Sequence, residues 1–335
     1  MLNQPAPEHA SESALLRLED VSRVFDIRRG LFGDRRSLVA VDHVSLNLAK
    51  GASIGLVGES GCGKSTLGRL ACGLLTPSAG QVLLDGRPLP PAGADSWAAG
   101  RIQMIFQDPF SSLNPRLSVG SAVAEPLAAR GVSRAERRAQ AEDMLATVGL
   151  GGMGNRYPHE FSGGQRQRIG IARALAVEPS LIIADEPVSA LDVSIQAQVL
   201  NLLNELKHDL DLTYIFVAHD LSVVEYISDR VGVMYLGNFV EVGEKEKIYS
   251  NPMHPYTQAL LSAVPVPDPT AKRERILLEG SIPSAHKPPT GCKFHTRCPK
   301  CMECCKTQAP ERYEVDDGHY VYCHLYDKER REQQK

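Results

Sequence analysis

The sequence predicts an α/β fold in which helices cover both faces of a mainly parallel β-sheet. Residues 54–57 and 181–184 are short apolar runs with the length of buried strands. Residues 67–75 and 193–210, which follow them, carry apolar side chains at helical spacing. Parallel strands require crossover connections and are buried on both faces, so this alternation of strand and helix favours such a sheet.

Length and composition are typical of a soluble globular protein with more than one domain. The chain has 335 residues, of which 43% are hydrophobic and 23% are charged. The net charge of −3 argues against a general role in binding nucleic acid. No apolar run approaches the roughly 20 residues of a membrane-spanning helix. The N-terminus lacks the features of a secretory signal, so we expect a cytosolic protein with a flexible lead at residues 1–14.

Other segments extend the α/β pattern along the chain. Residues 16–21 and 39–46 alternate polar and apolar side chains, as half-buried strands do, around a basic loop at residues 28–36. Further strands are expected, in order, at residues 80–85, 102–106, 213–218, 231–235 and 239–242. A turn is expected at residues 108–115, and further helices at residues 118–150 and 166–177.

The order of these segments also predicts the domains. The mainly helical stretch from about residue 107 to 170 interrupts the strands and is expected to be an inserted subdomain. Beyond Ser250 the composition becomes Pro-rich and then Cys-rich. A domain boundary is therefore expected near Asn251, between a domain at residues 15–250 and a small Cys-rich domain at residues 251–335.

A phosphate-binding P-loop is indicated by the pattern G-x-x-x-x-G-K-[ST]. Its residues are Gly58, Glu59, Ser60, Gly61, Cys62, Gly63, Lys64, Ser65 and Thr66. The pattern lies between an expected strand and an expected helix, so glycines let backbone N–H groups face phosphate oxygens at a helix N-terminus. Lys64 would place its charge between the outer phosphates, and the Ser65 hydroxyl would bind Mg²⁺.

Two carboxylates follow a second buried strand. Asp185 comes directly after residues 181–184, at the carboxyl end of a strand, where α/β sheets bind ligands. This position suits the Mg²⁺-binding aspartate of P-loop NTPases. Glu186 would accept a proton or a hydrogen bond from the attacking water.

With these residues in place, the chain resembles the ATP-binding subunits of ABC transporters. Residues 161–165, Phe-Ser-Gly-Gly-Gln, are similar to the signature sequence of that family, with Phe where Leu is common. Residues 189–192 resemble the D-loop, which ends at Asp192. Three single residues match further positions of the family: the Q-loop glutamine is Gln107, the switch histidine is His219, and the adenine-stacking aromatic is Phe25, where Tyr is commoner.

The resemblance implies a fold and a mechanism. The fold would be a RecA-like P-loop NTPase core with an antiparallel β subdomain and the helical insert. Catalytic roles would belong to Glu186, His219 and Gln107, and Gln107 would also approach the Mg²⁺ held by Ser65 and Asp185. ATP would be sandwiched between two subunits. The signature of the other subunit would face its γ-phosphate through Ser162, Gly163, Gly164 and Gln165, and phosphate release would open the dimer and drive alternating access in membrane subunits.

The C-terminal tail resembles one particular group of ABC transporter ATPases. Residues 251–261, which include His254-Pro255-Tyr256-Thr257, are similar to the tail motif of dipeptide/oligopeptide importer ATPases, and residues 291–299 continue it. Within that group the chain is most similar to the F-type subunit of dipeptide importers, which pairs with a related D-type ATPase. The resemblance therefore implies a heterodimer below two permease subunits, peripheral at the cytoplasmic face of the inner (cell) membrane, with peptide supplied by a binding protein.

Six of the eight cysteines lie between Cys292 and Cys323. In a reducing compartment such a group suggests a metal rather than disulfides. The family pattern selects Cys292, Cys298, Cys305 and Cys323, and some members hold a [4Fe–4S] cluster with such residues. Four thiolates suit this cluster or Zn²⁺.

Other donor sets remain open. Cys298, Cys301 and Cys304 form the C-x₂-C-x₂-C run of bacterial ferredoxins, without its C-x₃-C-P continuation. Histidines of the tail would be possible Zn²⁺ ligands but are expected to be solvated: His295, His319 and His324. A tail with free thiols alone is the remaining alternative.

Two other functions also remain open. A soluble ABC-type ATPase acting on DNA or ribosomes, with a metal- or redox-sensing tail, would share the ATPase motifs. Such chains usually carry two ATPase units or long coiled coils, whereas this chain has one P-loop and no sustained heptads. An importer of another small solute, such as nickel or glutathione, would also resemble this chain, because the cargo pocket lies in other subunits.

Overall fold

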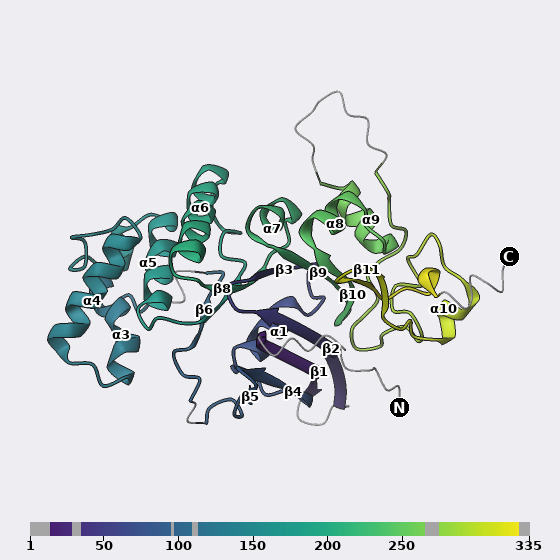
Figure 1. Ribbon diagram of the computed structural model, residues 1–335, viewed down its shortest axis with the longest axis horizontal. Coiled ribbons are helices and arrows are strands. Elements are labelled where there is room, and N and C mark those ends of the chain that lie inside the picture. Colours follow the sequence, from purple (N-terminus) through teal and green to yellow (C-terminus); the bar gives the residue numbers. More distant parts are fainter. Residues whose placement is uncertain (1–13, 29–34, 95–96, 109–112, 265–274, 328–335) are drawn as a thin grey trace.

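The computed structural model describes residues 14–28, 35–94, 97–108, 113–264 and 275–327. Three expected features lie partly outside them: the flexible lead (residues 1–13), the basic loop (residues 29–34) and the turn (residues 109–112). The described residues form two β-sheets with helices packed around them (Figure 1). The predicted α/β class is therefore confirmed.

The larger sheet has eight strands in the order β11-β12-β10-β9-β3-β8-β7-β6 among the described residues. Its parallel part consists of β3 (Ser53–Val57), β6 (Ile102–Ile105), β7 (Leu181–Asp185), β8 (Thr213–Val217) and β9 (Arg230–Tyr235). Antiparallel strands extend it beyond β9, namely β10 (Asn238–Glu244), β12 (His319–Val321) and β11 (Tyr313–Asp316). The predicted parallel core thus continues into a mixed sheet.

Both faces of the larger sheet are covered, because alternate side chains of each strand point to opposite sides. Ile182 joins one apolar cluster with helices α6 (Val193–Asp209) and α7 (Leu221–Ile227). Ile183, the next residue, joins the other cluster with helix α1 (Lys64–Ala71). No helix among the described residues is both long and apolar enough to cross a membrane.

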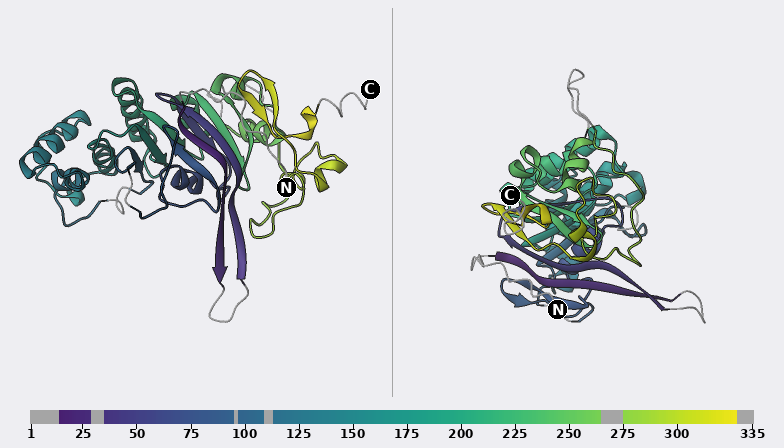
Figure 2. Two further views of the ribbon diagram at one scale, coloured as in Figure 1. Left: turned by 60° about the horizontal axis from the view of Figure 1, so that its bottom comes forward. Right: turned by 90° about the vertical axis from the view of Figure 1, so that its right-hand side faces the viewer.

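The smaller sheet is antiparallel and covers the other side of α1. Its order is β2-β1-β4-β5, with bounds β1 (Ala14–Arg28), β2 (Arg35–Ala49), β4 (Ala79–Leu84) and β5 (Arg87–Pro88). Figure 2 shows β1 and β2 projecting away from the rest of the molecule. Helix α1 buries Leu67 and Leu70 beneath this sheet and ends at Ala71, so the expected helical residues Leu74 and Leu75 lie beyond its end.

The helical insert lies at one end of the larger sheet, on the β6 side (Figure 1). Its helices are α3 (Val119–Ala129), α4 (Arg134–Thr147) and α5 (Gly163–Leu175), with a short 3-10 turn at Pro158–Glu160. The stretch of residues 118–150 is therefore helical as expected, but it forms two helices, α3 and α4. Gly131 has a φ of 73°, and Ser133 caps α4 in a capping box with Glu136, so the chain stops and restarts the helix there. The Ser-x-x-Glu spacing was a readable signal for this break.

The tail packs against the larger sheet rather than standing apart from it. Helix α8 (Lys245–Ser250) directly precedes it, and the tail contributes helices α9 (Pro255–Ser262) and α10 (Glu303–Thr307), a 3-10 turn at His324–Tyr326, and the strands β11 and β12. Strand β12 pairs with β10, and Phe294 is buried in the same apolar cluster as the sheet. The division at Asn251 stays a prediction, and the sheet runs continuously across it.

A buried carboxylate ties this tail to β10. Glu241 is fully buried and accepts hydrogen bonds from the backbone N–H groups of Met253 and His254, each at 2.8 Å. His319 Nε2 lies 2.8 Å from the same carboxylate. His319 and His324 are 2% and 5% exposed, so the expectation that these histidines are solvated is wrong. Burial suits them because each ring has a polar partner.

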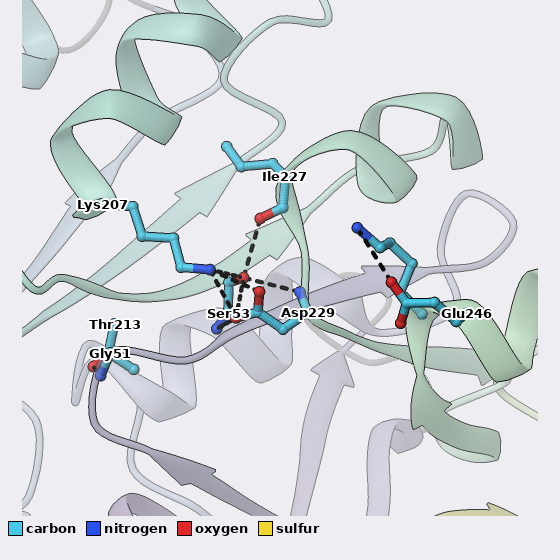
Figure 3. A network of polar contacts seen from close by, with 8 residues as sticks. Gly51, Ser53, Lys207, Thr213, Ile227, Asp229 and Glu246 are labelled. Carbon is cyan, nitrogen blue, oxygen red and sulfur yellow. Dashed lines mark hydrogen bonds and ion pairs between the residues drawn. The ribbon is translucent and has the colours of Figure 1, made fainter.

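A second buried charge ties the start of β3 to α6 and to the segment before β9 (Figure 3). The Lys207 ammonium is buried and donates to Ser53 Oγ at 2.9 Å and to Asp229 Oδ2 at 2.7 Å. Ser53 also donates from its backbone N–H to Asp229 Oδ2, at 2.7 Å. Burial by itself would raise the pKa of Asp229, but the hydrogen bonds from Lys207 and Ser53 outweigh it and lower that pKa.

We expect Asp229→Asn to lower the free energy of unfolding by about 2 kcal/mol, because the buried Lys207 loses its counter-ion while half of the Asp229 side chain faces solvent. A carboxyl with a lowered pKa stabilises the fold above its ordinary value of 3.8 and loses that contribution as the pH falls through the lower folded value. Urea unfolding at pH 7 and at decreasing pH measures both effects. Asp211→Asn, which breaks an exposed pair with Lys50, should change stability by less than about 0.5 kcal/mol. Equal losses of stability in the two variants would show that the buried Lys207–Asp229 pair contributes no more than an exposed one.

Candidate active site

Four neighbouring parallel strands end at one edge of the larger sheet, and each is followed by expected site residues. Strand β3 leads into the P-loop, and β6 is followed by Gln107. Strand β7 ends at Asp185, with Glu186 next, and β8 is followed by His219. The parallel pairing of these strands places their carboxyl ends side by side, which is where such sheets bind ligands.

The P-loop is shaped by glycines that no other residue could replace without movement. Gly58 has a φ of 147°, and a Cβ there would lie 2.2 Å from the carbonyl oxygen of Met234. Gly63 has a φ of 108°, and a Cβ there would lie 2.2 Å from the carbonyl oxygen of Ala40. These close approaches let the loop turn tightly between β3 and the first residue of α1.

Lys64 lies inside the loop, with only 5% of its surface exposed. Its ammonium donates to the carbonyl oxygens of Gly58, at 2.7 Å, and Glu59, at 3.1 Å. The charge is therefore held by the loop itself, at the first residue of helix α1, where phosphate binding is favoured.

Ser65 and Asp185, which are expected to bind Mg²⁺, lie side by side. Ser65 Oγ donates to Asp185 Oδ1 at 2.7 Å, so the two oxygens already converge. Burial raises the pKa of Asp185, while the hydrogen bond from Ser65 and the charge of Arg69 act in the opposite direction. Two adjacent hard oxygens fit Mg²⁺, and a cation there would offset the burial of the carboxylate.

The three expected catalytic residues meet at Glu186. Gln107 Nε2 donates to Glu186 Oε2 at 3.0 Å, and His219 Nδ1 lies 3.5 Å from the same oxygen. The Gln107 amide also donates to Ser189 Oγ, at 3.3 Å. Its nitrogen thus faces Glu186, and its expected approach to Mg²⁺ stays a prediction. Glu186 has a φ of 48°, and its backbone N–H donates to the carbonyl oxygen of Val217. This backbone conformation holds the Glu186 side chain at the edge of the sheet.

The signature residues begin helix α5. Ser162 is the N-cap residue, and it exchanges hydrogen bonds with Gln165 in a capping box, at 3.0 and 3.4 Å. A Cβ on Gly164 would lie 2.2 Å from Ile195 Cγ2, so this helix packs closely on α6. Within the described part of the chain, no hydrogen bond or ion pair joins residues 162–165 to residues 58–66.

The remaining expected nucleotide contacts lie at separate places. Phe25 is on β1 opposite Leu38, and the guanidinium of Arg23 lies 4.7 Å from the centre of its ring. Ala40, which touches the P-loop at Gly63, is two residues from Leu38 on β2, so Phe25 is close to the loop along the strand. Asp192 is exposed at the start of α6 and makes no capping hydrogen bond there.

Four tail thiols of the expected cluster set lie near one another. Burial raises the pKa of Cys292 and Cys323 to about 12 and that of Cys305 to about 11. Cys292, Cys298 and Cys305 are all close enough to raise the pKa of Cys323 further. The Cys323 thiol is therefore within electrostatic range of the other three thiols of the expected set. In a [4Fe–4S] cluster each thiolate binds a different iron, so the four sulfurs lie further apart than the ligands of a single metal ion do.

A second donor set overlaps the first at Cys305. The ligand atoms of Cys304, Cys305 and His324 lie within 4.8 Å of one another. His324 Nε2 is held by the Gln308 carbonyl oxygen at 2.9 Å, which leaves a buried Nδ1 without a hydrogen-bond partner. A histidine with one nitrogen held in this way presents the other to a metal. Cys301, a member of the ferredoxin-like run, is exposed.

Two contacts at the P-loop were not indicated by any motif. Arg297, within the expected tail motif, forms two hydrogen bonds with the carboxylate of Glu59. Tyr256, from the other tail motif, accepts a hydrogen bond from the Glu59 backbone N–H. Both motifs were readable, but nothing in them pointed to the P-loop.

Known protein families and curated proteins are similar to this chain in sequence. Residues 41–189 match the family described as "ABC transporter", and residues 240–305 match the family described as "Oligopeptide/dipeptide transporter, C-terminal region". The oligopeptide transport ATP-binding protein AppF of Bacillus subtilis (strain 168) is 54% identical, over 95% of this chain and 99% of its own. The putative oligopeptide transport ATP-binding protein YkfD of the same organism is 50% identical, over 93% and 95%.

Two solved structures share the fold. The structure of cbiO1 from Clostridium perfringens, part of the ABC transporter complex cbiONQ, matches this chain with a TM-score of 0.61 and 27% sequence identity. The match covers 71% of this chain and 92% of cbiO1. The ATP-binding cassette MJ0796, in a dimeric post-hydrolysis state bound to ADP and Pi, has a TM-score of 0.60 and 28% identity, over 69% and 98%. The RecA-like core with its β subdomain and helical insert is thereby confirmed.

We expect Gly58→Ala to weaken ATP binding by at least about tenfold, because its Cβ would clash with the Met234 carbonyl oxygen and force the P-loop to move. Gly86→Ala is the matched control: Gly86 also has a positive φ, but its Cβ would have no atom within 4 Å, so only local strain results. Calorimetric titration with Mg²⁺-ATP measures both. An unchanged dissociation constant for Gly58→Ala would show that the loop tolerates a side chain there.

Proposed function

Because this chain belongs to the ABC transporter ATPases that carry an oligopeptide/dipeptide-type C-terminal region, we propose that it powers the import of peptides through a membrane transporter. The ATPase activity rests on the meeting of Gln107, Glu186 and His219 beside the P-loop. The peptide cargo is supported by relatives named as oligopeptide and peptide transport ATP-binding proteins. A soluble ATPase acting on DNA or ribosomes would leave the match of residues 240–305 unexplained.

ATP would bind with its phosphates at the N-terminus of α1. Lys64 would exchange its loop carbonyl partners for phosphate oxygens, because the ammonium is already inside the loop. Ser65 and Asp185 would hold Mg²⁺ through the oxygens that converge at 2.7 Å. The metal supplies neutralisation of the phosphate charge.

Glu186 would take the proton of the attacking water. Gln107 donates to its carboxylate, which holds the side chain at the sheet edge, and His219 lies on the same oxygen. Such positioning is the main protein contribution to phosphoryl transfer, because little covalent chemistry is needed from the enzyme.

A second subunit would complete the site. Residues 162–165 form the N-terminus of α5, where the N–H groups of Gly163 and Gly164 take no part in the capping box, and they are not bonded to the P-loop of their own chain in the part that the structure describes. They would therefore meet a γ-phosphate held by another chain. The dimeric form of MJ0796 supports such an arrangement. We infer a heterodimer with a D-type ATPase on two permease subunits at the cytoplasmic face of the membrane, supplied by a peptide-binding protein, with no nucleic-acid partner.

The thiols of Cys292, Cys298, Cys305 and Cys323 would hold a [4Fe–4S] cluster. Cys305 and Cys323 are buried and Cys292 and Cys298 are partly buried, and four cysteine thiolates are the usual ligands of such a cluster. Zn²⁺ is the alternative metal. Cys304, Cys305 and the free Nδ1 of His324 supply three of the four ligands that a structural zinc site needs.

For the ATPase, we expect Glu186→Gln to bind ATP with nearly unchanged affinity and to lose at least about a hundredfold in turnover, because the amide cannot accept a proton. Lys64→Ala should instead lose ATP binding, because the phosphate charge is no longer compensated. Calorimetry measures binding, and phosphate release measures turnover. Normal turnover by Glu186→Gln would refute its role in activating water.

For the tail, we expect anaerobically purified protein to carry about four iron atoms and four sulfides per chain, with visible charge-transfer absorbance. Cys323→Ser should lose the iron, whereas Cys304→Ser should keep it, because only Cys323 belongs to the cluster set. Metal analysis of both variants decides between the sets. Zinc in place of iron, lost in Cys304→Ser and His324→Gln, would identify the overlapping site as the true one.

A further inference from the structure

We propose that Arg297 and Tyr256 are positioning residues of the nucleotide site, which act through Glu59 of the P-loop. The C-terminal tail would thus contribute to ATP binding in addition to containing the group of cysteines. This inference rests on the proposed binding of ATP at the same P-loop.

The first contact is an ion pair with two hydrogen bonds. Arg297 Nη1 donates to Glu59 Oε2 at 2.7 Å, and Arg297 Nη2 donates to Glu59 Oε1 at 3.0 Å. The Arg297 side chain is only 8% exposed, and that of Glu59 is 26% exposed. A guanidinium that meets a carboxylate with two parallel bonds fixes its orientation as well as its charge, so Glu59 has little freedom to turn.

The second contact holds the backbone of the same residue. The Glu59 N–H donates to the hydroxyl oxygen of Tyr256 at 2.9 Å. Tyr256 is fully buried, and its ring packs edge-on against Tyr235, with centroids 4.8 Å apart, and against Phe294, at 5.3 Å. The hydroxyl is therefore a rigid acceptor.

These contacts reach the phosphate site through one more bond. The carbonyl oxygen of Glu59 accepts from Lys64 Nζ at 3.1 Å. Glu59 is thus held by its side chain, its N–H and its carbonyl, and the last of these touches the lysine that would bind phosphate. Movement of Glu59 would therefore shift the Lys64 ammonium before ATP binds.

The tail also contacts segments that border the other end of the loop. Lys293 donates to Asp42 Oδ2 and to the Leu236 carbonyl oxygen, both at 2.8 Å. Asp42 lies two residues from Ala40, whose carbonyl oxygen faces Gly63. The segment from Lys293 to Arg297 therefore contacts the P-loop directly at Glu59 and is linked to Gly63 only indirectly, through strand β2.

Charge gives Arg297 a role that packing alone would not. Glu59 is the second residue of a loop that must accept several negative phosphate charges. An unpaired and partly buried carboxylate there would oppose the incoming phosphates, because opposing charges are poorly screened at such sites. Arg297 neutralises that carboxylate before ATP arrives.

The test compares ATP binding by four full-length variants in the Glu186→Gln background, which prevents turnover. We expect Arg297→Ala to weaken ATP binding by at least about tenfold, since the Glu59 carboxylate becomes unpaired. Arg297→Ala with Glu59→Gln should recover most of the affinity, because the opposing charge is gone. Glu59→Gln alone should change it by less than about threefold, and Arg297→Lys should lie between wild type and Arg297→Ala.

Two further variants separate positioning from damage to the fold. Tyr256→Phe keeps the packed ring and removes the acceptor of the Glu59 N–H, so ATP binding should weaken by several fold while the thermal unfolding midpoint stays near that of wild type. Lys306→Ala breaks an exposed pair with Glu303 in the same tail and should leave ATP binding unchanged.

Three results would overturn the proposal. Wild-type affinity in Arg297→Ala would show that the ion pair does not serve the P-loop. If Arg297→Ala binds ATP equally weakly with and without Glu59→Gln, neutralisation of the Glu59 carboxylate is not the role of Arg297. If Tyr256→Phe binds ATP with wild-type affinity, the hydrogen bond from the Glu59 N–H to Tyr256 does not support the nucleotide site. A parent chain that binds no ATP would instead refute the proposed function itself, so the two failures are distinct.

Discussion

The parallel pairing of β3, β8, β7 and β6 is the constraint on which the site depends. Because the strands pair in register, Leu56 lies opposite Val217, and Val217 lies opposite Asp185. Each of the four strands therefore ends within a residue or two of its neighbour, and the groups that follow emerge at one edge. The phosphate loop, the metal ligands and the water-activating carboxylate come from segments far apart in sequence. Only the shared edge of the sheet brings them within hydrogen-bonding distance.

Charged groups inside this protein occur with partners, and those partners join distant segments. Lys207 of α6 binds Asp229 beside the start of β3, and Glu241 accepts hydrogen bonds from two backbone N–H groups of the tail and contacts a histidine of the tail. A buried charge without such partners would be costly, so each network favours a single arrangement of its segments. Lys64 differs, because its partners are carbonyl oxygens of its own loop. Such neutral partners are easier to exchange for phosphate oxygens than a carboxylate would be.

Local features were predictable from the sequence, and distant contacts were not. The P-loop and the buried strands follow from residue spacing within a few positions, and the fold class follows from their order. The break between α3 and α4 lies within a stretch that was expected to be helical throughout, although Gly131, Ser133 and Glu136 signal the end of one helix and the start of the next. The meeting of Gln107 with Glu186 followed from resemblance, since spacing along the chain cannot report which strands pair. The contact of Arg297 with Glu59 had no signal, because an arginine in a polar tail motif is usually solvated.

The contact between Glu59 and Arg297 spans 238 residues of sequence, and this has a consequence for how the protein is made. Ribosomes add residues at roughly 5 to 20 per second, so the second residue of the P-loop waits roughly 10 to 50 s for its partner. The β-sheet that carries the loop is complete, apart from β12 and β11, well before that time. A nascent chain therefore has a folded core and an unfinished nucleotide site. Full support of the loop would arrive only after Arg297 has left the ribosome, which delays the onset of ATP binding until long after the P-loop itself has been made.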